Sequence, residues 1–161
     1  MLKRLGVVAA VATAVVAAGG YSVIARAGGG DGSYGKTFTL VESGSGVYVD
    51  EQTQAPPDFS KPIPPGDSVV FKADVLRESV KVGEARGDCT SAFDNKFICS
   101  VAFSITKHGT LELQVLFDLA DPQGDYVVTG GTGDFAGTHG WAHFTTLSNG
   151  DEVHTFHLSD D

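Results

Sequence analysis

A glutamate at position 42 is the residue best placed to do chemistry. Phe38, Leu40 and Glu42 alternate along residues 36–42, so they share one face of an extended strand. If that face lines the interior of a fold, the carboxylate is buried and its charged form is disfavoured. Such a group can act as a general acid or base, or stabilise a developing cation. The alternative is that the strand ends here and the carboxylate is solvated at the mouth of the fold.

Histidines are the second candidate for chemistry. His139, Trp141 and His143 share one strand parity and could cluster with His154 or His157 of a following strand to hold a metal ion. His154 and His157 are three positions apart, so they face opposite sides of a regular strand. We therefore interpret the histidines as surface or mouth residues and Trp141 as a packing residue, and we predict no metal site. The sequence contains no G-x-S-x-G elbow of a serine hydrolase.

The chain has two cysteines, Cys89 and Cys99. The segment between them includes Asp94-Asn95, a good turn pair, which suits a bridge between neighbouring strands close to their connecting loop. A metal-binding pair is the alternative, but the C-x9-C spacing is not that of a zinc knuckle, and two more ligands would be needed. We predict a Cys89–Cys99 disulfide, which is the default in an exported protein.

The N-terminus has the three parts of a secretory signal. Lys3 and Arg4 make a basic start, residues 5–18 an apolar run, and Ala25-Arg26-Ala27 a small-residue cleavage site. We expect residues 1–27 to be removed as a signal peptide; an uncleaved anchor is the alternative. No other segment approaches the roughly 20 apolar residues of a membrane span. We therefore expect a secreted, extracellular protein without a membrane span after cleavage.

Charge narrows the classes of partner. The 161 residues include 11 Lys and Arg against 20 Asp and Glu, a formal net charge of −9 at pH 7. Loss of the basic residues of the signal peptide makes the remaining chain more acidic still. Nothing supplies a basic stripe for phosphates, which argues against nucleic acid and against an anionic membrane surface as partners.

Most of the remaining sequence alternates between apolar and polar residues, with turn residues every 8–12 positions. This pattern is typical of an all-β sandwich or barrel. Residues 50–66 carry five prolines and are predicted to form an irregular loop across one end of the fold. The number of strands fits an eight-stranded antiparallel closed barrel, in which closure removes exposed edges. The predicted strands are 36–42, 67–77, 80–86, 97–107, 110–119, 126–129, 140–147 and 152–158.

The inward faces of these strands should line or fill the barrel. An eight-stranded barrel is either filled by side chains or holds one small ligand. We expect residues 28–35, which are rich in glycine, to be a flexible lead-in to a single domain over residues 36–161. The predicted ligand-lining residues are Phe38, Leu40, Val69, Phe71, Leu111, Leu113, Val115 and Phe117.

Glycine is concentrated in residues 126–144. A G-x-G-x-x-A spacing there matches part of a dinucleotide-binding fingerprint, but the residues that follow do not begin a helix, so we reject a nucleotide site. We interpret the segment as a tight turn between strands, because glycine permits positive φ and close packing. The turn glycines are Gly130, Gly131, Gly133, Gly137 and Gly140.

Several motifs in order resemble those of the allene oxide cyclase and dirigent barrel superfamily. Residues 128–140 resemble its GGTG-x-[FY]-x-G-x-x-G segment, residues 66–71 its G-D-x-V-x-F strand, and residues 82–89 its V-G-x-x-x-G-x-C run. His108-Gly109 stands where the family has a short turn, and Tyr126 leads into the glycine segment. The resemblance covers about residues 36–147.

The resemblance implies an eight-stranded barrel with an apolar lumen and no metal or redox cofactor. Plant allene oxide cyclases close a ring on an unsaturated fatty-acid epoxide, dirigent proteins orient the coupling of phenoxy radicals, and some bacterial relatives cyclise polyketides. Glu42 falls near a lumenal glutamate of the plant cyclases. Because such barrels often associate, we expect a homodimer or homotrimer.

The leading hypothesis is a secreted barrel that binds a small apolar molecule of lipid or natural-product metabolism. It would cyclise or isomerise that molecule without a cofactor, with Glu42 as the catalytic residue. Two alternatives stay open. One is a non-catalytic, lipocalin-like binding module, and the other is an extracellular structural or interaction protein.

Overall fold

The computed structural model describes residues 34–44, 46–50, 55–94 and 96–160. The predicted signal peptide and most of the predicted lead-in therefore lie outside the described residues. Tyr34, at the end of the lead-in, packs edge-on against Phe38 with 4.8 Å between ring centroids. The guanidinium of Arg77 lies 4.6 Å above the same ring. Among the described residues, contacts with the folded domain therefore include Tyr34.

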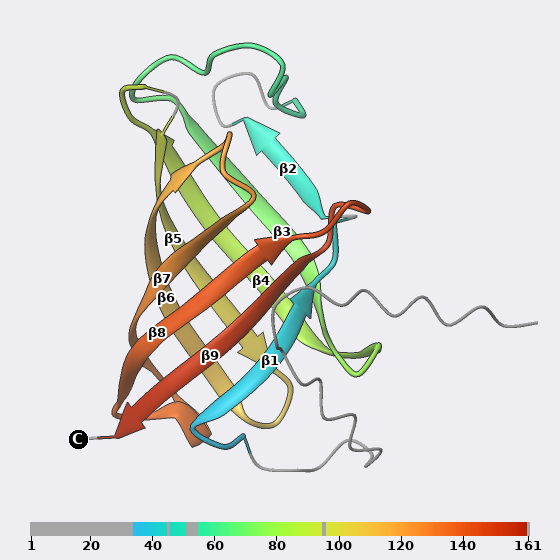
Figure 1. Ribbon diagram of the computed structural model, residues 1–161, viewed down its shortest axis with the longest axis vertical. Helices are drawn as coiled ribbons and strands as arrows, with labels where there is room; N and C mark the ends of the chain where they lie inside the picture. The colour runs from blue at the N-terminus through green and yellow to red at the C-terminus, as the bar shows by residue number, and fades with distance from the viewer. Residues whose placement is uncertain (1–33, 45, 51–54, 95, 161) are drawn as a thin grey trace, which may run out of the picture.

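The described strands form one closed antiparallel sheet (Figure 1). Strands β3 to β9 each pair with the next, and β1 closes the barrel by pairing with both β9 and β3. β1 and β2 pair with successive parts of β3, so together they occupy one strand position in the barrel wall. The barrel therefore has eight strand positions. The predicted fold class is confirmed. The elements are β1 Thr37–Glu42, β2 Val47–Asp50, β3 Ser68–Arg77, β4 Val80–Ser91, β5 Lys96–Ile105, β6 Gly109–Asp118, β7 Gln123–Gly131, the 3-10 helix η1 Gly133–Phe135, β8 Thr138–Thr146 and β9 Glu152–Asp160.

Alternation determines which residues lie inside the barrel. In β5 every second residue from Phe97 to Ile105 is buried, and the intervening positions are mostly exposed. Burying a large apolar side chain stabilises a fold by about 1.5–3 kcal/mol. Aromatic rings fill much of the interior: Phe156 stacks on Phe38 at 4.9 Å and meets Phe103 edge-on at 5.5 Å. No helix among the described residues is long and apolar enough to cross a membrane.

Strands β4 and β7 are much longer than the sequence pattern predicts. β4 continues past residue 86 to Ser91, because its pairing with β5 runs on through Cys89 opposite Cys99. β7 begins at Gln123 rather than at residue 126. The alternation of apolar and polar residues is interrupted in β4 by Gly87. This position requires glycine because a side chain there would overlap the ring of Phe71. β2 was not predicted, since its 4 residues are too few to show a period.

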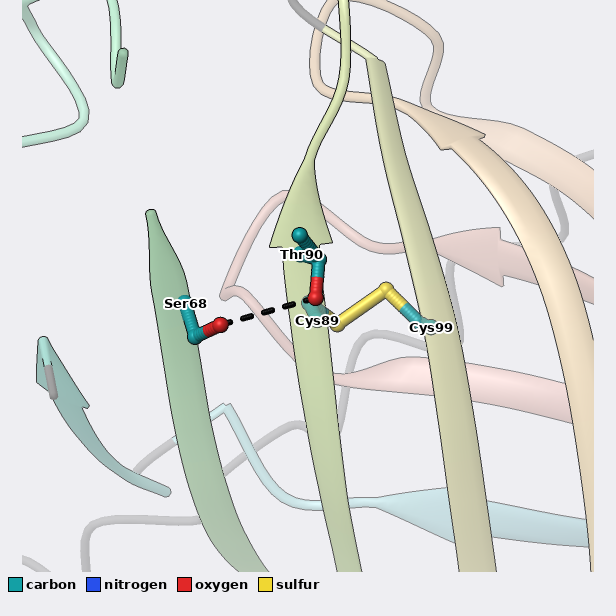
Figure 2. The surroundings of a disulfide bond; sticks show 4 residues. All are labelled: Ser68, Cys89, Thr90 and Cys99. Carbon is teal, nitrogen blue, oxygen red and sulfur yellow. Dashed lines mark hydrogen bonds between the residues drawn. A yellow bond between two sulfur atoms is a disulfide. The ribbon is translucent and has the colours of Figure 1, made fainter. Parts of the chain in front are cut away.

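The predicted disulfide joins β4 to β5 (Figure 2). Cys89 and Cys99 are directly opposite partners in the two strands, with 4.0 Å between their Cα atoms. On the other side of β4, the hydroxyls of Ser68 and Thr90 lie 3.5 Å apart in a hydrogen bond to β3. The covalent link therefore sits within a continuous three-strand region of the barrel wall.

The glycine-rich segment forms the connection from β7 through η1 to β8. Gly133 has φ +63°, and a side chain there would overlap the carbonyl oxygen of His108. Gly137 has φ +75°, also in the left-handed region that favours glycine. Gly130, by contrast, faces open space, so the structure gives no steric reason for glycine there. The tight turn carries Phe135 into the barrel, where it is buried.

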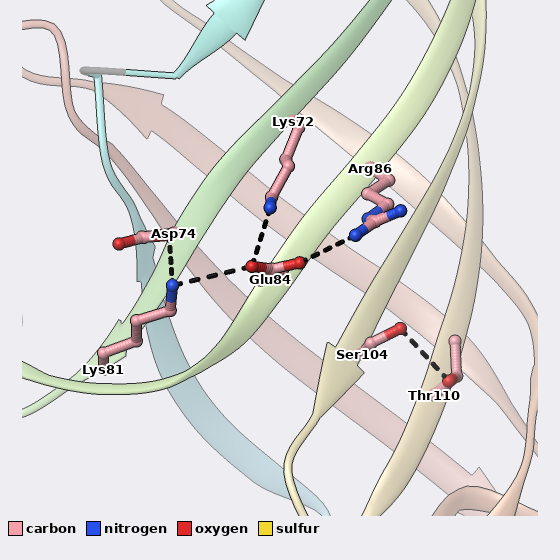
Figure 3. A network of polar contacts seen from close by, with 7 residues as sticks. All are labelled: Lys72, Asp74, Lys81, Glu84, Arg86, Ser104 and Thr110. Carbon is pink, nitrogen blue, oxygen red and sulfur yellow. Dashed lines mark hydrogen bonds and ion pairs between the residues drawn. The ribbon is translucent and has the colours of Figure 1, made fainter.

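Charged side chains form a network on the outside of β3 and β4 (Figure 3). The Glu84 carboxylate lies 2.9 Å from Nζ of Lys72 and 3.0 Å from the guanidinium of Arg86, and Lys81 pairs with Asp74 at 2.6 Å. Hydrogen bonds from Lys72 and Arg86 lower the pKa of Glu84 to about 2. Because such exposed pairs add little stability, the network mainly marks the solvent face of the wall.

A candidate site inside one end of the barrel

A cavity of about 180 Å³ opens at one end of the barrel. Its wall comes from the ends of strands that meet there, and Phe59, from the segment that crosses this end in Figure 1, stands at the mouth against Tyr48. Most of the lining is apolar or aromatic, which suits a ligand with an apolar body. The lining residues are Glu42, Tyr48, Phe59, Val69, Phe71, Cys89, Phe97, Cys99, Val101, Phe117, Leu119, Tyr126 and Glu152.

The residues expected to line the lumen separate into two groups. Val69, Phe71 and Phe117 line the cavity. The others are buried in the hydrophobic core and are not part of the cavity wall. The alternation pattern identifies which side chains point inward, but it carries no information on which part of the interior is filled. The buried group consists of Phe38, Leu40, Leu111, Leu113 and Val115.

Three ionisable side chains converge where β1 pairs with β9. Glu42 and Glu152 are directly opposite partners, and His154 lies two positions along β9, opposite Leu40. Nε2 of His154 lies 3.6 Å from Oε2 of Glu42 and 3.6 Å from Oε2 of Glu152. Glu42 is 6% exposed and His154 is fully buried. Glu42 therefore lies inside the barrel, and the two carboxylates form part of the cavity wall.

Burial controls the protonation of this cluster. It raises the pKa of Glu42 to about 8, with a further contribution from the neighbouring charge of Glu152. It also raises the pKa of Glu152, against a hydrogen bond that the hydroxyl of Thr146 donates at 3.3 Å. The pKa of His154 is lowered to about 3 by burial. The imidazole is therefore neutral near pH 7, and its 3.6 Å contacts with the carboxylates are not ion pairs.

His154 has two polar atoms without a protein partner. Neither Nδ1 nor Nε2 makes a hydrogen bond with the described residues. Instead the imidazole is surrounded by rings, with Phe103 at 5.0 Å and Tyr126 at 5.7 Å between centroids. Leaving a buried polar group unpaired costs about 1–3 kcal/mol. Since the fold bears this cost, the site is a better candidate for chemistry than for stability.

Two tyrosines complete the polar part of the cavity wall. Burial, followed by the nearby Glu42 and Glu152, raises the pKa of Tyr48 to about 12. The pKa of Tyr126 is also raised by burial and by both glutamates. Both phenols therefore stay protonated at neutral pH. Each can donate a hydrogen bond to a polar group placed in the cavity.

The interpretation of the histidines as surface or mouth residues is wrong for His154. The spacing argument itself is correct, because His154 points inward while His157 lies outside and stacks on Trp141 at 4.1 Å. His143 is held by Asp125 at 2.7 Å on the outer surface. The possible metal cluster of His139, Trp141 and His143 with His154 does not form, because His154 lies on the opposite, inner face of the barrel wall.

Sequence reasoning missed Glu152 as a site residue, and it considered His154 only as a partner of His139, Trp141 and His143. The signal was present, because Glu152, His154, Phe156 and Leu158 alternate on one face of β9. Because Phe156 and Leu158 are apolar, this face of β9 is expected to point into the barrel, and Glu152 and His154 lie on the same face. What the sequence pattern could not supply is the register that sets Glu152 opposite Glu42.

No protein-family model matches the sequence, and no curated protein matches it. Several solved structures resemble the fold. A pyocyanin demethylase shares 23% identity at a TM-score of 0.59, covering 76% of this chain and 99% of its own. A pterocarpan synthase dirigent protein shares 19% identity at a TM-score of 0.55, and the match covers 76% of this chain and 91% of that protein. A heme-binding cyclase that catalyses a [4 + 2] cycloaddition in neoabyssomicin biosynthesis shares 14% identity at a TM-score of 0.53, and the match covers 76% of this chain and 62% of that protein.

These similarities show that the chain has a dirigent-like closed β-barrel fold. The predicted resemblance to this superfamily is thus confirmed at the level of the fold. Membership in the allene oxide cyclase family itself stays a prediction.

Proposed function

We propose that the barrel binds one small, mainly apolar molecule in the cavity and isomerises or cyclises it. The observation that carries the proposal is an apolar cavity with two neighbouring carboxyl groups in its wall, buried Glu42 and partly buried Glu152. A dry cavity of about 150 Å³ holds a benzene molecule. A cavity of about 180 Å³ therefore suits a ligand whose enclosed part is one or two rings, or a folded chain of similar size.

The cavity would act on its ligand by orientation and by the placement of polar groups. An apolar enclosure fixes one conformer of a flexible molecule, and such positioning is worth several kcal/mol of a barrier. Glu42 is the proposed acid–base or cation-stabilising group, because its carboxyl lies in the cavity wall and is screened from water. Isomerisation and ring closure leave the oxidation state of the substrate unchanged, so they need no redox partner.

The structural neighbours give this proposal general support. They are named as a pyocyanin demethylase, a pterocarpan synthase dirigent protein and a cyclase for a [4 + 2] cycloaddition. All three names describe chemistry of small molecules. Because the similarity is one of fold alone, it supports a small molecule as the class of ligand and does not assign a reaction.

A binding module without catalysis is the second candidate function. One observation favours binding without catalysis. At 3.6 Å, Nε2 of His154 makes no hydrogen bond with the carboxylate of Glu42 or of Glu152, so these groups do not form a chain that could pass a proton. A bound molecule with a polar end would then be held by Glu42, Glu152 and the tyrosines without being changed. Both candidates require the same cavity, and they differ in whether Glu42→Gln abolishes turnover or leaves the ligand's fate unchanged.

We further infer that the protein works outside the reducing cytoplasm and self-associates. The Cys89–Cys99 disulfide supports an oxidising location. Exposed apolar residues on the outer faces of neighbouring strands support a homodimer or homotrimer. In register, Ile98 of β5 is opposite Leu116 of β6, and Val127 of β7 is opposite Trp141 of β8.

Filling the cavity from inside tests the proposed function. Val101 lines the cavity, whereas Val127 is exposed on the outer face of the wall. We expect Val101→Phe to weaken binding of 2-naphthol, a two-ring probe with one hydroxyl, by at least tenfold in the presence of chelator. The matched variant Val127→Phe should bind like the wild type. Equal binding by both variants, with both folded by circular dichroism, would place the ligand outside the barrel and overturn the proposal.

A further inference from the structure

We propose that Glu42, Glu152 and His154 form a binding site for one divalent transition-metal ion of the Zn²⁺ type, in the wall of the barrel cavity. The three side chains offer one imidazole nitrogen and two carboxylate oxygens, and their ligand atoms all lie within 4.8 Å of one another. The inference goes beyond the proposed ligand binding and does not depend on it.

The separations of the ligand atoms fit one metal ion. With bonds of about 2.1 Å to nitrogen and oxygen, two ligand atoms of a tetrahedral zinc ion are about 3.4 Å apart. Nε2 of His154 lies 3.6 Å from Oε2 of Glu42 and equally far from Oε2 of Glu152. These two distances are too long for hydrogen bonds but close to the separation that one ion requires, and the two carboxylate oxygens lie within 4.8 Å of each other.

The unpaired imidazole is the independent sign of a ligand. His154 is fully buried, and Nε2 is directed at both carboxylates without a hydrogen bond to either. A neutral imidazole nitrogen is the form that coordinates metals. An ion at this point would give Nε2 a partner and would neutralise the carboxylates of buried Glu42 and partly buried Glu152 together.

The donor set selects the class of metal. Imidazole with carboxylates suits zinc and the neighbouring divalent ions. Calcium needs six to eight oxygen ligands and magnesium keeps several waters, so a site with two glutamates and a histidine favours neither. Both cysteines are joined in the disulfide, which leaves no thiolate for soft ions such as Cu⁺.

The surroundings indicate a site of modest affinity that is open to the cavity. Glu152 has an outer partner in the hydroxyl of Thr146, but Nδ1 of His154 has no acceptor among the described residues. Missing outer partners typically cost 10–100-fold in metal affinity. Glu42 and Glu152 line the cavity, and three protein ligands leave a fourth position. A metal ion here would meet the polar group of a molecule bound beside it.

Titration of the untagged, metal-free protein tests the site directly. We expect calorimetry with Zn²⁺ alone to give one ion per chain, and Co²⁺ to give the d–d absorption of a four- or five-coordinate ion with nitrogen and oxygen ligands. His154→Phe, which keeps an aromatic ring among aromatic rings, should weaken Zn²⁺ binding more than tenfold. Glu152→Gln should do the same without removing the ring, so loss of folding in one variant leaves the other as a test.

A histidine on the outer wall provides the matched control. His143 is paired with Asp125 on the solvent side of β7 and β8, and His143→Asn should leave Zn²⁺ affinity and the Co²⁺ spectrum unchanged. Zn²⁺ binding that survives both His154→Phe and Glu152→Gln, or that disappears with His143→Asn, would overturn the proposal, as would an absence of binding by the wild type. None of these outcomes affects the 2-naphthol test, which is made in chelator.

Discussion

Glu42 and Glu152 lie directly opposite each other on β1 and β9, and one carboxylate oxygen of each lies 3.6 Å from the same buried nitrogen of His154. The two strands are the first and last of the barrel, so only closure of the sheet brings these residues together. Two neighbouring carboxyl groups beside a neutral imidazole with no hydrogen bond to it, in a mainly apolar cavity, are unfavourable for stability. This arrangement is the feature on which the functional proposals depend.

The first prediction concerns stability as a function of pH in chelator. The pKa of Glu42 is about 8 in the folded state and about 4.5 when unfolded, so the folded state holds this proton more tightly. The free energy of unfolding should therefore fall as the pH rises from about 4.5 to 8, by a few kcal/mol at most. Urea unfolding of the wild type and of Glu42→Gln should show this fall as a difference between the two proteins.

The wild type must be compared with Glu42→Gln because His154 changes the free energy of unfolding with pH in the opposite direction. Its pKa is lowered to about 3, so its contribution to stability is lost as the pH falls below about 6.5. Glu112→Gln, on the exposed face of β6, is the control for loss of a charge. If the difference between the wild type and Glu42→Gln is flat from pH 4.5 to 8, Glu42 is solvated in solution.

The second prediction concerns which ligands the cavity prefers. A buried carboxyl that loses water without gaining a partner costs about 1–3 kcal/mol. A ligand with a hydroxyl should thus bind more tightly than an apolar one of equal shape. We expect 2-naphthol to bind at least fivefold more tightly than 2-methylnaphthalene, and Glu42→Leu to reduce this ratio. An unchanged ratio in the variant, measured by fluorescence titration in chelator, would remove Glu42 from the binding site.

The third prediction concerns the disulfide. Cys89 and Cys99 join two strands and line the cavity, so their bond should stabilise both the fold and the site. Replacing both by alanine should lower the free energy of unfolding by about 2–4 kcal/mol, the range for a loop of this size. Thiol titration of the protein, purified without reductant, should find no reactive thiol. Two thiols per chain would show that the bond does not form in the native protein.

The fourth prediction concerns self-association. Leu116 and Trp141 are exposed apolar side chains on the outer wall, and a second copy of the chain would cover them. Sedimentation at micromolar concentration should give the mass of a dimer or trimer. Leu116→Glu should reduce this to the mass of one chain, whereas Lys72→Glu, in the charged network on β3 and β4, should not. A wild type that sediments as a single chain contradicts the prediction.

Local sequence patterns predict most of this fold but only part of the site. Alternation along each strand predicts the barrel and the inward direction of Glu42, and the turn between two cysteines predicts their bridge. Glu152 and His154 escape prediction as partners of Glu42 because the β1–β9 register joins the two ends of the domain. The position of the cavity is also invisible to alternation, since Leu111 and Phe117 point inward alike but only Phe117 borders the open space.

Both candidate functions require a small molecule to bind inside the barrel, beside Glu42 and Glu152. Intermolecular NMR contacts between 2-naphthol and the valine methyl groups measure this most directly. We expect contacts from the probe to Val69 and Val101, which line the cavity, and none to Val127 on the outer wall. Contacts to Val127 without contacts to Val69 and Val101 would contradict it.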